Sequence, residues 1–415
     1  MQKILDWMND KLVPKMNKIT SNVWVQVIRD SMLQLLPFIF IGSIFTVIGI
    51  INSVFPGFPI DGNALSGWTF GKISLFVAFL IPFNYCEKMR LRSHRIIAGS
   101  VSLILFLIII TPRIEVNEII GFGDSSLGAT GMFCAMVAGV FTSLVVRLFR
   151  KFSFFKEDSV IPDFIKEWFD LIVPIFFVVI TGWIVVLKLK VDLFGVIEIL
   201  FKPFSSGMQI LGVYICFELA RTLFYTMGVS AWVLTGIWTP VTLGAIAKNA
   251  ELAAAGTATV QNLSMVTAET ANAYIMMGGT GATLALSLML LGAKSRKLKT
   301  LGKASIVPSL ININEPVMFG CVVWNPILMI PALLNAIALP VSTFIFMKVI
   351  PIVPIPVHVF NFWFAPCPVL GYFSSQSIMG VVLVLINLVI SGIIYYPFFK
   401  VYDNQELQKE LEAEG

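Results

Sequence analysis

Long apolar runs dominate this sequence and constrain its fold more than any other feature. A helix needs about twenty apolar residues to cross the roughly 30 Å hydrocarbon core of a bilayer. Runs of about that length lie near residues 27–51, 70–86, 96–112, 128–147, 168–187, 204–227, 229–247, 271–292, 326–349 and 377–399. Of the 415 residues, 57% are hydrophobic and only 13% are charged, which is far from the composition of a soluble domain. The sequence therefore predicts an all-α polytopic membrane protein with about ten transmembrane helices.

Lysines and arginines gather in a few short loops between these runs. The clusters lie at 11–18, 88–95, 147–156 and 294–303, whereas the loops 52–69 and 115–127 carry almost none. Because positively charged loops stay on the cytoplasmic side of a membrane, this pattern places both termini in the cytoplasm. We expect a multi-pass protein of the cell membrane, whose first partner is the lipid bilayer itself.

Two further apolar stretches, 304–325 and 353–375, are interrupted by prolines and asparagines. Broken backbone of this kind lines binding sites in transporters, so we interpret both stretches as re-entrant hairpins. The expected organisation is a cytoplasmic or interfacial amphipathic segment at 1–26, a five-helix domain at 27–190, a transport domain with both hairpins at 191–400, and a cytoplasmic tail at 401–415.

The first hairpin carries the tripeptide Asn314-Glu315-Pro316. An ionisable side chain at membrane depth costs about 2.5–3.5 kcal/mol even on lenient scales and is expected to face a polar cavity. Pro316 supplies no backbone N–H and pushes the residue before it out of helical geometry. Such backbone is tolerated in a bilayer only where protein or water surrounds it. The tripeptide is therefore predicted to belong to a substrate site.

Other residue types exclude several classes of function. The chain has only two histidines, His94 and His358, and five widely spaced cysteines in apolar runs, which we expect to be small core residues. No metal site, disulfide framework or cofactor is expected from these residues. The net charge of +5 lies in short loops, where it reports topology rather than a nucleic acid partner.

Two polar islands interrupt the second half. The stretch GGTGATL at 278–284 has three glycines, which let helices or a ligand approach the backbone closely. Glu218 and Arg221 are three residues apart in an apolar run, so they can pair on one helix face. The sequence leaves open whether they form a structural ion pair or contact a substrate directly.

The ordered set of motifs resembles a known family. GGTGATL at 278, KSRKLKTLGKASIVP at 294 and NINEPVMFGCVVWNPILMIP at 312 are its densest part, with IRDSMLQLLPFIFIGS at 28 and YYPFFKVYDNQEL at 395 in support. They resemble the C component of enzyme II in the bacterial phosphoenolpyruvate-dependent sugar phosphotransferase system, in its lactose/cellobiose/chitobiose branch.

This resemblance implies a permease that binds an extracellular oligosaccharide, expected to be a disaccharide, and moves it to the cytoplasmic side. It implies a homodimer whose interface is the domain at 27–190, with the sugar bound by 191–400. A separate B component, carrying a phosphorylated cysteine, would donate phosphate to the sugar, so the chain would be the membrane subunit of a phosphotransferase complex. The tail after Lys400 is too short for a fused B domain.

The resemblance also implies roles for individual residues. Glu315 would bind sugar hydroxyls and accept the proton of the hydroxyl that is phosphorylated, and Asn314 would lie beside it. Tyr225 occupies the position of an aromatic residue that packs against the sugar ring. Backbone and hydroxyl contacts to the sugar are implied for Gly279, Thr280 and Thr283, and for Thr130 in the GATG stretch at 128–131.

One departure from the family pattern affects the predicted chemistry. The family motif Gly-Ile-His-Gly reads here Gly228-Val229-Ser230-Ala231, and a serine cannot serve as a base or a cation in place of an imidazole. A sugar facilitator or sensor that has lost phosphotransfer therefore stays an alternative to the phosphotransferase permease. An ion-coupled secondary transporter is a third reading. The sequence does not name the sugar.

Overall fold

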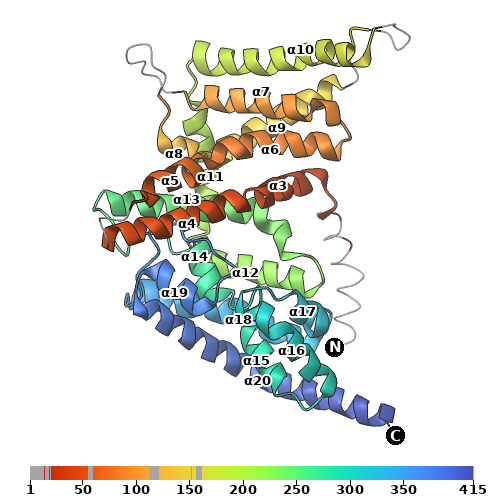
Figure 1. Ribbon diagram of the computed structural model, residues 1–415, viewed down its shortest axis with the longest axis vertical. Coiled ribbons are helices and arrows are strands. Elements are labelled where there is room, and N and C mark those ends of the chain that lie inside the picture. The colour runs from red at the N-terminus through yellow and green to blue at the C-terminus, as the bar shows by residue number, and fades with distance from the viewer. Residues whose placement is uncertain are drawn as a thin grey trace. The chain divides into compact units, whose positions relative to one another are not determined.

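The computed structural model describes residues 14, 18, 20–54, 59–111, 121–150, 152–155 and 161–414, and its secondary structure there is helical throughout (Figure 1). The predicted amphipathic segment at 1–26 lies mostly outside these residues, as do the basic residues Lys11, Lys15, Lys151 and Lys156. The described chain forms two compact units. The N-terminal unit contains Ser21–Phe204 and Thr235–Pro240, and the C-terminal unit contains Ser205–Leu234 and Val241–Gly415. The predicted domain boundaries and the role of each domain stay predictions.

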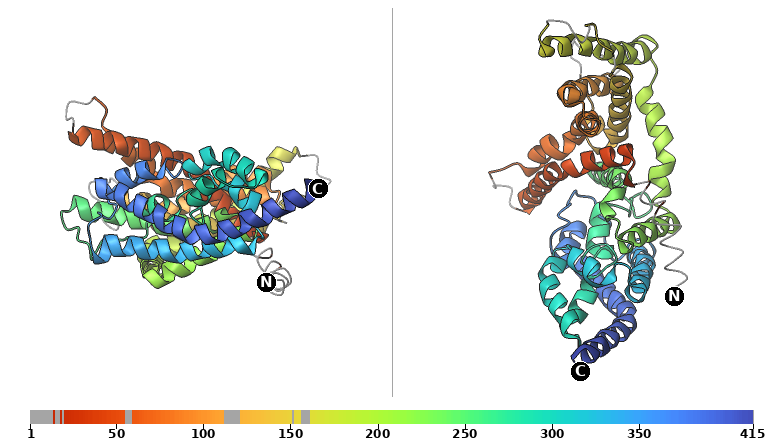
Figure 2. Two further views of the ribbon diagram at one scale, coloured as in Figure 1. Left: turned by 90° about the horizontal axis from the view of Figure 1, so that it is seen from below. Right: turned by 90° about the vertical axis from the view of Figure 1, so that its right-hand side faces the viewer.

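The N-terminal unit is a bundle of apolar helices. Its elements are α3 (Val23–Gln34), α4 (Leu36–Val54), α5 (Gly62–Thr69), α6 (Ile73–Lys88), α7 (Arg95–Ile109), α8 (Asp124–Leu127), α9 (Met132–Phe149), α10 (Asp163–Gly182) and the first part of α11 (Leu193–Gly207). Helices α6, α7 and α9 pack against one another, and Figure 1 and the right-hand view of Figure 2 show them side by side. Gly139 permits the close approach of α9 to α6, because a Cβ there would lie 2.7 Å from the Cβ of Ile81.

The C-terminal unit contains the predicted substrate residues. Its elements are α12 (Leu211–Thr226), α13 (Thr235–Ala254, from Val241 on), α14 (Ala268–Thr270), the π-helical η7 (Ala271–Ile275), α15 (Leu284–Leu291), α16 (Arg296–Leu310), α17 (Glu315–Val317), the π-helical η8 (Met318–Val322), α18 (Pro326–Phe344), the π-helical η9 (Ile345–Val349), α19 (Cys367–Ser375) and α20 (Ile378–Glu414). Helix α20 packs along α15, α18 and α19, while α12 packs on α18.

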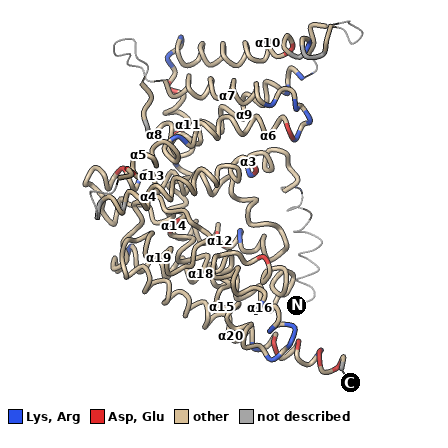
Figure 3. Tube along the Cα trace, viewed as in Figure 1, with Lys and Arg blue, Asp and Glu red and all other residues tan. Residues whose placement is uncertain are grey.

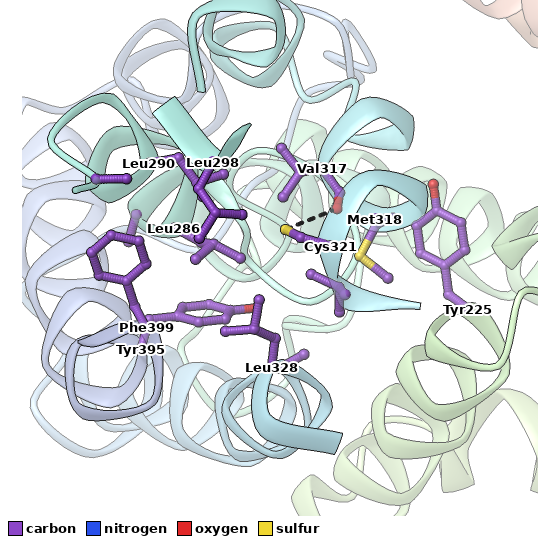
Figure 4. Close-up of a cluster of buried hydrophobic side chains, with 14 residues drawn as sticks. Tyr225, Leu286, Leu290, Leu298, Val317, Met318, Cys321, Leu328, Tyr395 and Phe399 are labelled. Carbon is purple, nitrogen blue, oxygen red and sulfur yellow. Dashed lines mark hydrogen bonds between the residues drawn. The ribbon is translucent and has the colours of Figure 1, made fainter. Parts of the chain in front are cut away.

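A hydrophobic core holds these elements together beside the predicted site. Figure 4 shows side chains of α15, α16, α17, η8, α18 and α20 converging on one cluster. Leu286, Leu290, Leu298 and Tyr395 are completely buried in it, and helices in a membrane associate through close van der Waals packing of this kind. This core fixes the first hairpin against α15 and α20.

The two stretches predicted as hairpins differ in form. In 304–325, α16 ends at Leu310, the chain turns over 311–314, and α17 and η8 follow. In 353–375, residues 351–366 form no helix before α19 begins at Cys367. Whether either stretch re-enters a membrane stays a prediction.

The all-α polytopic class is confirmed, but the helix count differs from the predicted ten. Among the described residues, seven helices are long and apolar enough to cross a membrane, or eight if α11 and α12 count as one broken span. The run at 271–292 is interrupted because Gly278, Gly279 and Gly281 adopt positive φ angles, which leaves α15 only eight residues long. The run at 229–247 begins with a 3-10 turn, and α13, which follows it, is not among the seven.

The cysteines are correctly predicted as core residues in four of five cases. Cys86, Cys134, Cys321 and Cys367 are buried, whereas Cys216 is exposed on α12. The prediction for Cys216 was wrong, because an apolar run supplies lipid-facing as well as core-facing positions and composition does not separate them.

Hydrogen bonds connect the start of α16 to the C-terminal part of α20. The carboxylate of Asp403 accepts hydrogen bonds from the backbone N–H groups of Lys294 and Ser295, at 2.9 and 3.0 Å. Glu410 accepts from the N–H groups of Arg296 and Lys297, both at 2.9 Å. Figure 3 shows basic and acidic positions lying together here. These bonds satisfy backbone groups that a helix N-terminus leaves unpaired.

Candidate functional site

A short polar turn between α16 and α17 carries the predicted central residues. Asn312 adopts a left-handed conformation with φ +61°, which asparagine tolerates better than most residues. The N–H groups of Asn312 and Ile313 close the end of α16 on the carbonyls of Ser309 and Pro308. Pro316 then lies at the start of α17, where its missing N–H costs nothing.

Asn314 joins three of the predicted site residues. Its Nδ2 donates to the carbonyl of Thr280 at 2.9 Å and to Oγ1 of Thr283 at 3.0 Å. Its Oδ1 accepts from the hydroxyl of Tyr225 at 3.2 Å. The amide is 3% exposed, so these bonds replace its contacts with water.

The glycine turn is shaped to receive Asn314. Gly279 has φ +98°, and a Cβ there would lie 2.4 Å from the side-chain Cγ of Asn314. On the other side of the turn, the hydroxyl of Tyr395 donates to the carbonyl of Gly281 at 2.7 Å, and Ser391 Oγ donates to that of Ala282 at 3.0 Å. Helix α20 therefore fixes the glycine turn, and the glycine turn accepts the hydrogen bonds of Asn314.

Glu315 differs from its neighbours because it is exposed, whereas Asn314 is buried. Among the residues that the structure describes, it has no hydrogen-bond or ion-pair partner. An ionised carboxylate has only acceptor sites. The protein thus presents a hydrogen-bond acceptor next to a rigid set of amide, hydroxyl and backbone groups.

Ser230 lies on a segment that is attached to the first hairpin. The backbone N–H of Trp324, just after η8, donates to the carbonyl of Thr226 at 3.0 Å. Val229 and Trp324 pack against the same small cluster, around Met227. Ser230 itself is exposed, and its Oγ accepts from the N–H of Trp232 at 3.4 Å.

Two further predicted sets lie on the 3-10 turn Ala129–Gly131 and on α12. Thr130 belongs to the N-terminal unit, in the 3-10 turn Ala129–Gly131, so its contact with a sugar stays a prediction. Glu218 and Arg221 form a buried ion pair on α12, with side chains 2% and 6% exposed. This finding shows the pairing, whereas a direct contact with a substrate stays a prediction.

Three asparagines in apolar runs, which were not predicted as site residues, bond to segments around the turn. Asn272 Nδ2 donates to Asn361 Oδ1 at 3.1 Å. Asn312 Nδ2 donates to the carbonyls of Asn272 and Trp363. An amide in a membrane-buried segment needs partners, and this signal would have identified all three asparagines.

The exposed carboxylate of Glu315 suits a ligand with hydroxyl groups, because its two oxygens can accept several hydrogen bonds. The buried Asn314 and Thr283 bond to each other and support the turn that carries Glu315. In the described part of the chain, no group of three or more His, Cys, Asp or Glu residues is placed to hold a metal ion.

The model of the phosphotransferase system EIIC family matches residues 29–336. The chain belongs to this family. It is 29% identical to the lichenan permease IIC component of Bacillus subtilis (strain 168), over 100% of this chain and 97% of that protein. It is also 29% identical to the lactose-specific EIICB component of Streptococcus mutans, over 98% of this chain and 74% of that protein.

A solved structure agrees in fold along almost the whole chain. The crystal structure of the transporter ChbC, the IIC component of the N,N'-diacetylchitobiose-specific phosphotransferase system, superimposes with a TM-score of 0.85 and 28% identity. The match covers 97% of this chain and 99% of that one. The predicted family is confirmed, and this EIIC protein is a multi-pass membrane permease component of a phosphotransferase system.

Proposed function

We propose that this EIIC protein binds an extracellular disaccharide or a similar short oligosaccharide and moves it to the cytoplasmic side for phosphorylation. The names of the similar proteins support this substrate class, since they specify lichenan, lactose and N,N'-diacetylchitobiose. The observation that carries the proposal is the exposed carboxylate of Glu315, which has no partner in the described part of the chain and lies beside the buried Asn314.

Five of the predicted residues have a role in this proposal. Glu315 accepts hydrogen bonds from the sugar and takes the proton of the hydroxyl that is phosphorylated, as a general base. Asn314, Thr280 and Thr283 fix the turn that carries it. Tyr225 supports this turn from α12 and presents an apolar ring beside it.

The phosphoryl donor is proposed to be a separate B component. Some similar proteins combine both parts under the name EIICB, which supports a direct encounter of C and B components. The exposed cations of α16, Arg296, Lys299 and Lys303, face one side of that helix and would attract an anionic partner. We further propose a homodimer formed through the N-terminal unit, with both termini in the cytoplasm.

A binding screen tests the proposed substrate class. The purified protein is titrated with glucose- and galactose-based mono- and disaccharides, and binding is read as a rise in the unfolding temperature. We expect at least one disaccharide to bind and Glu315→Gln to abolish or strongly weaken this binding, because an NH2 donor replaces one acceptor oxygen and the negative charge is lost. Unchanged affinity in a monodisperse Glu315→Gln variant would overturn the role of Glu315.

A second assay separates transport with phosphorylation from transport alone. Vesicles containing the protein are supplied with a phosphorylated B component, and the accumulated sugar is analysed. We expect a phosphorylated product. Uptake of unmodified sugar only would instead support the facilitator reading, which the serine at position 230 motivated.

A further inference from the structure

The side chain of Asn312 is bonded to four separate segments of the C-terminal unit. Its Nδ2 donates to the carbonyls of Trp363 at 2.9 Å and Asn272 at 3.2 Å. Its Oδ1 accepts from the N–H of Gly278 at 2.7 Å and from the thiol of Cys367 at 3.2 Å. An amide has two donor hydrogens and an oxygen with two lone pairs, so its full capacity is used.

Three of the four partners connect Asn312 to the glycine turn, to η7 and to the stretch 351–366. Gly278 begins the turn that reaches Thr280 and Thr283, the partners of Asn314. Trp363 belongs to the non-helical stretch 351–366, and Asn272 is linked to the same stretch through Asn361. Asn312 is therefore the point where the glycine turn, η7 and this stretch are tied together.

The backbone connects Asn312 to the acceptor carboxylate. Asn312 precedes Glu315 by three residues, in a turn whose left-handed φ of +61° is fixed while the side chain is bonded. The amide is only 9% exposed, and bonds in a buried setting are strong and directional. A change in these bonds displaces the carboxylate relative to the surrounding segments.

We propose that Asn312 is a positioning residue of the sugar site, which sets the distance of Glu315 from the segments around Gly278, Asn272 and Trp363. This inference rests on the proposed function of Glu315. Asn312 does not itself contact the sugar in this proposal. It acts by keeping the groups that contact the sugar at fixed positions relative to one another.

Asn312→Asp is the sharpest variant. It keeps the shape and the acceptor oxygen toward Gly278, but replaces the donor with an oxygen that faces two carbonyls. We expect the KM for the sugar to rise about tenfold or more, from the usual cost of losing buried partners. Asn312→Gly provides a second variant, because glycine accepts the left-handed backbone without strain and adds no charge.

Asn249 offers a matched control in the same unit. Its Nδ2 donates to the carbonyls of Ser264 and Pro356, both at 2.8 Å, and its Oδ1 accepts from the N–H of Ser264 at 2.7 Å. It is completely buried. Asn249→Asp therefore disrupts the same kind of amide clamp, which includes the stretch 351–366 through Pro356, but leaves the glycine turn and the turn that carries Glu315 untouched.

The experiment measures sugar uptake or phosphorylation with the full-length protein, together with its unfolding temperature without sugar. A purely structural role reduces the amount of active protein, which lowers the maximal rate and leaves KM unchanged. We expect Asn249→Asp to behave in this way and both Asn312 variants to raise KM. Equal KM values for Asn312→Asp, Asn312→Gly and Asn249→Asp would overturn the inference.

Glu315→Gln is measured in parallel to separate the two proposals. If Glu315→Gln loses sugar binding while the Asn312 variants keep the normal KM, only the positioning role fails. If Glu315→Gln binds sugar normally, the proposed site itself fails, and the inference about Asn312 fails with it.

Discussion

The hydroxyl of Tyr225 donates a hydrogen bond to Oδ1 of Asn314, although 89 positions separate the two residues in the sequence. This bond connects α12 to the turn that carries Glu315. The ring of Tyr225 also lies edge-on to Phe319 of η8, with centroids 6.1 Å apart. A residue that the family resemblance places against the sugar thus also supports the hairpin.

Tyr225→Phe tests this double role. The ring stays, but the buried Oδ1 of Asn314 loses a donor, which costs about 1–3 kcal/mol when no water replaces it. We expect a lower unfolding temperature and weaker sugar binding. The two effects are measured by thermal unfolding with and without sugar. If both values equal those of the unmodified protein, the bond does not contribute.

Gly279→Ala should be far more damaging than its small size suggests. The new Cβ would lie 2.4–2.7 Å from three atoms of the Asn314 side chain, and φ is +98°. Left-handed backbone at a non-glycine residue alone costs about 1–3 kcal/mol. We expect loss of sugar binding and a marked fall in the unfolding temperature.

Gly244→Ala is the control for that substitution. No heavy atom lies within 4 Å of a Cβ at Gly244, which is inside α13. Replacing a helical glycine by alanine stabilises by about 0.5–1 kcal/mol where space allows. A Gly279→Ala protein as stable as Gly244→Ala would show that the glycine turn adapts.

The sequence predicted the polar hairpin because the signals for it are local. Glu315 and Pro316 are conspicuous in an apolar run, and three glycines mark the turn at 278–284. The partners of those residues could not be predicted in the same way. Asn314 reaches Thr283 across 31 positions, and nothing in either segment specifies the other. Hydrogen-bond partners of this kind are fixed by tertiary packing.

The structure has seven or eight membrane-length helices among the described residues, where hydropathy predicts about ten spans, and the reason is related. Hydropathy counts apolar residues, but it does not register where backbone geometry interrupts a helix. At 271–292 the run stays apolar while the glycines at 278, 279 and 281 adopt positive φ. Helix α15 therefore begins only at Leu284. A run of glycines should count as a break, even inside a stretch of the right length.

Asp403 is expected to stabilise α16 from the end of α20. Its two oxygens accept from the N–H groups of Lys294 and Ser295, and Asp403→Asn replaces one acceptor with a donor and removes the charge. We expect the unfolding temperature to fall by a few degrees, because a lost buried acceptor costs about 1–3 kcal/mol. Glu412→Gln, on an exposed position nearby, should leave it unchanged. Equal values for both variants would contradict the proposed stabilisation.

The orientation of the chain can be tested at Lys299. If the basic cluster 294–303 is cytoplasmic, a cysteine introduced at Lys299, which is exposed, should react with an impermeant reagent only after the cells are opened. Cys216 is itself exposed, so the experiment needs a Cys216→Ser background. Labelling of Lys299→Cys in intact cells would reverse the proposed orientation.

The final prediction concerns Ser230, where the chain departs from the histidine that the family resemblance implies. Ser230 is exposed and follows the left-handed Gly228 on a segment attached to the hairpin at Trp324. An imidazole therefore has room without displacing core side chains. A positioned acid or base contributes about 10²–10⁴-fold to a proton-transfer step. We expect Ser230→His to raise the phosphorylation rate measured with a matched B component.

Ser230→Phe separates the chemistry of that substitution from its size. Phenylalanine fills a similar volume but cannot transfer a proton, so it should not accelerate phosphorylation and should weaken sugar binding if the ring enters the site. A rise in rate with histidine alone would assign the effect to the imidazole. Unaltered sugar binding and phosphorylation in both variants would show that Ser230 lies outside the site, and that Gly228-Val229-Ser230-Ala231 does not correspond to the histidine motif.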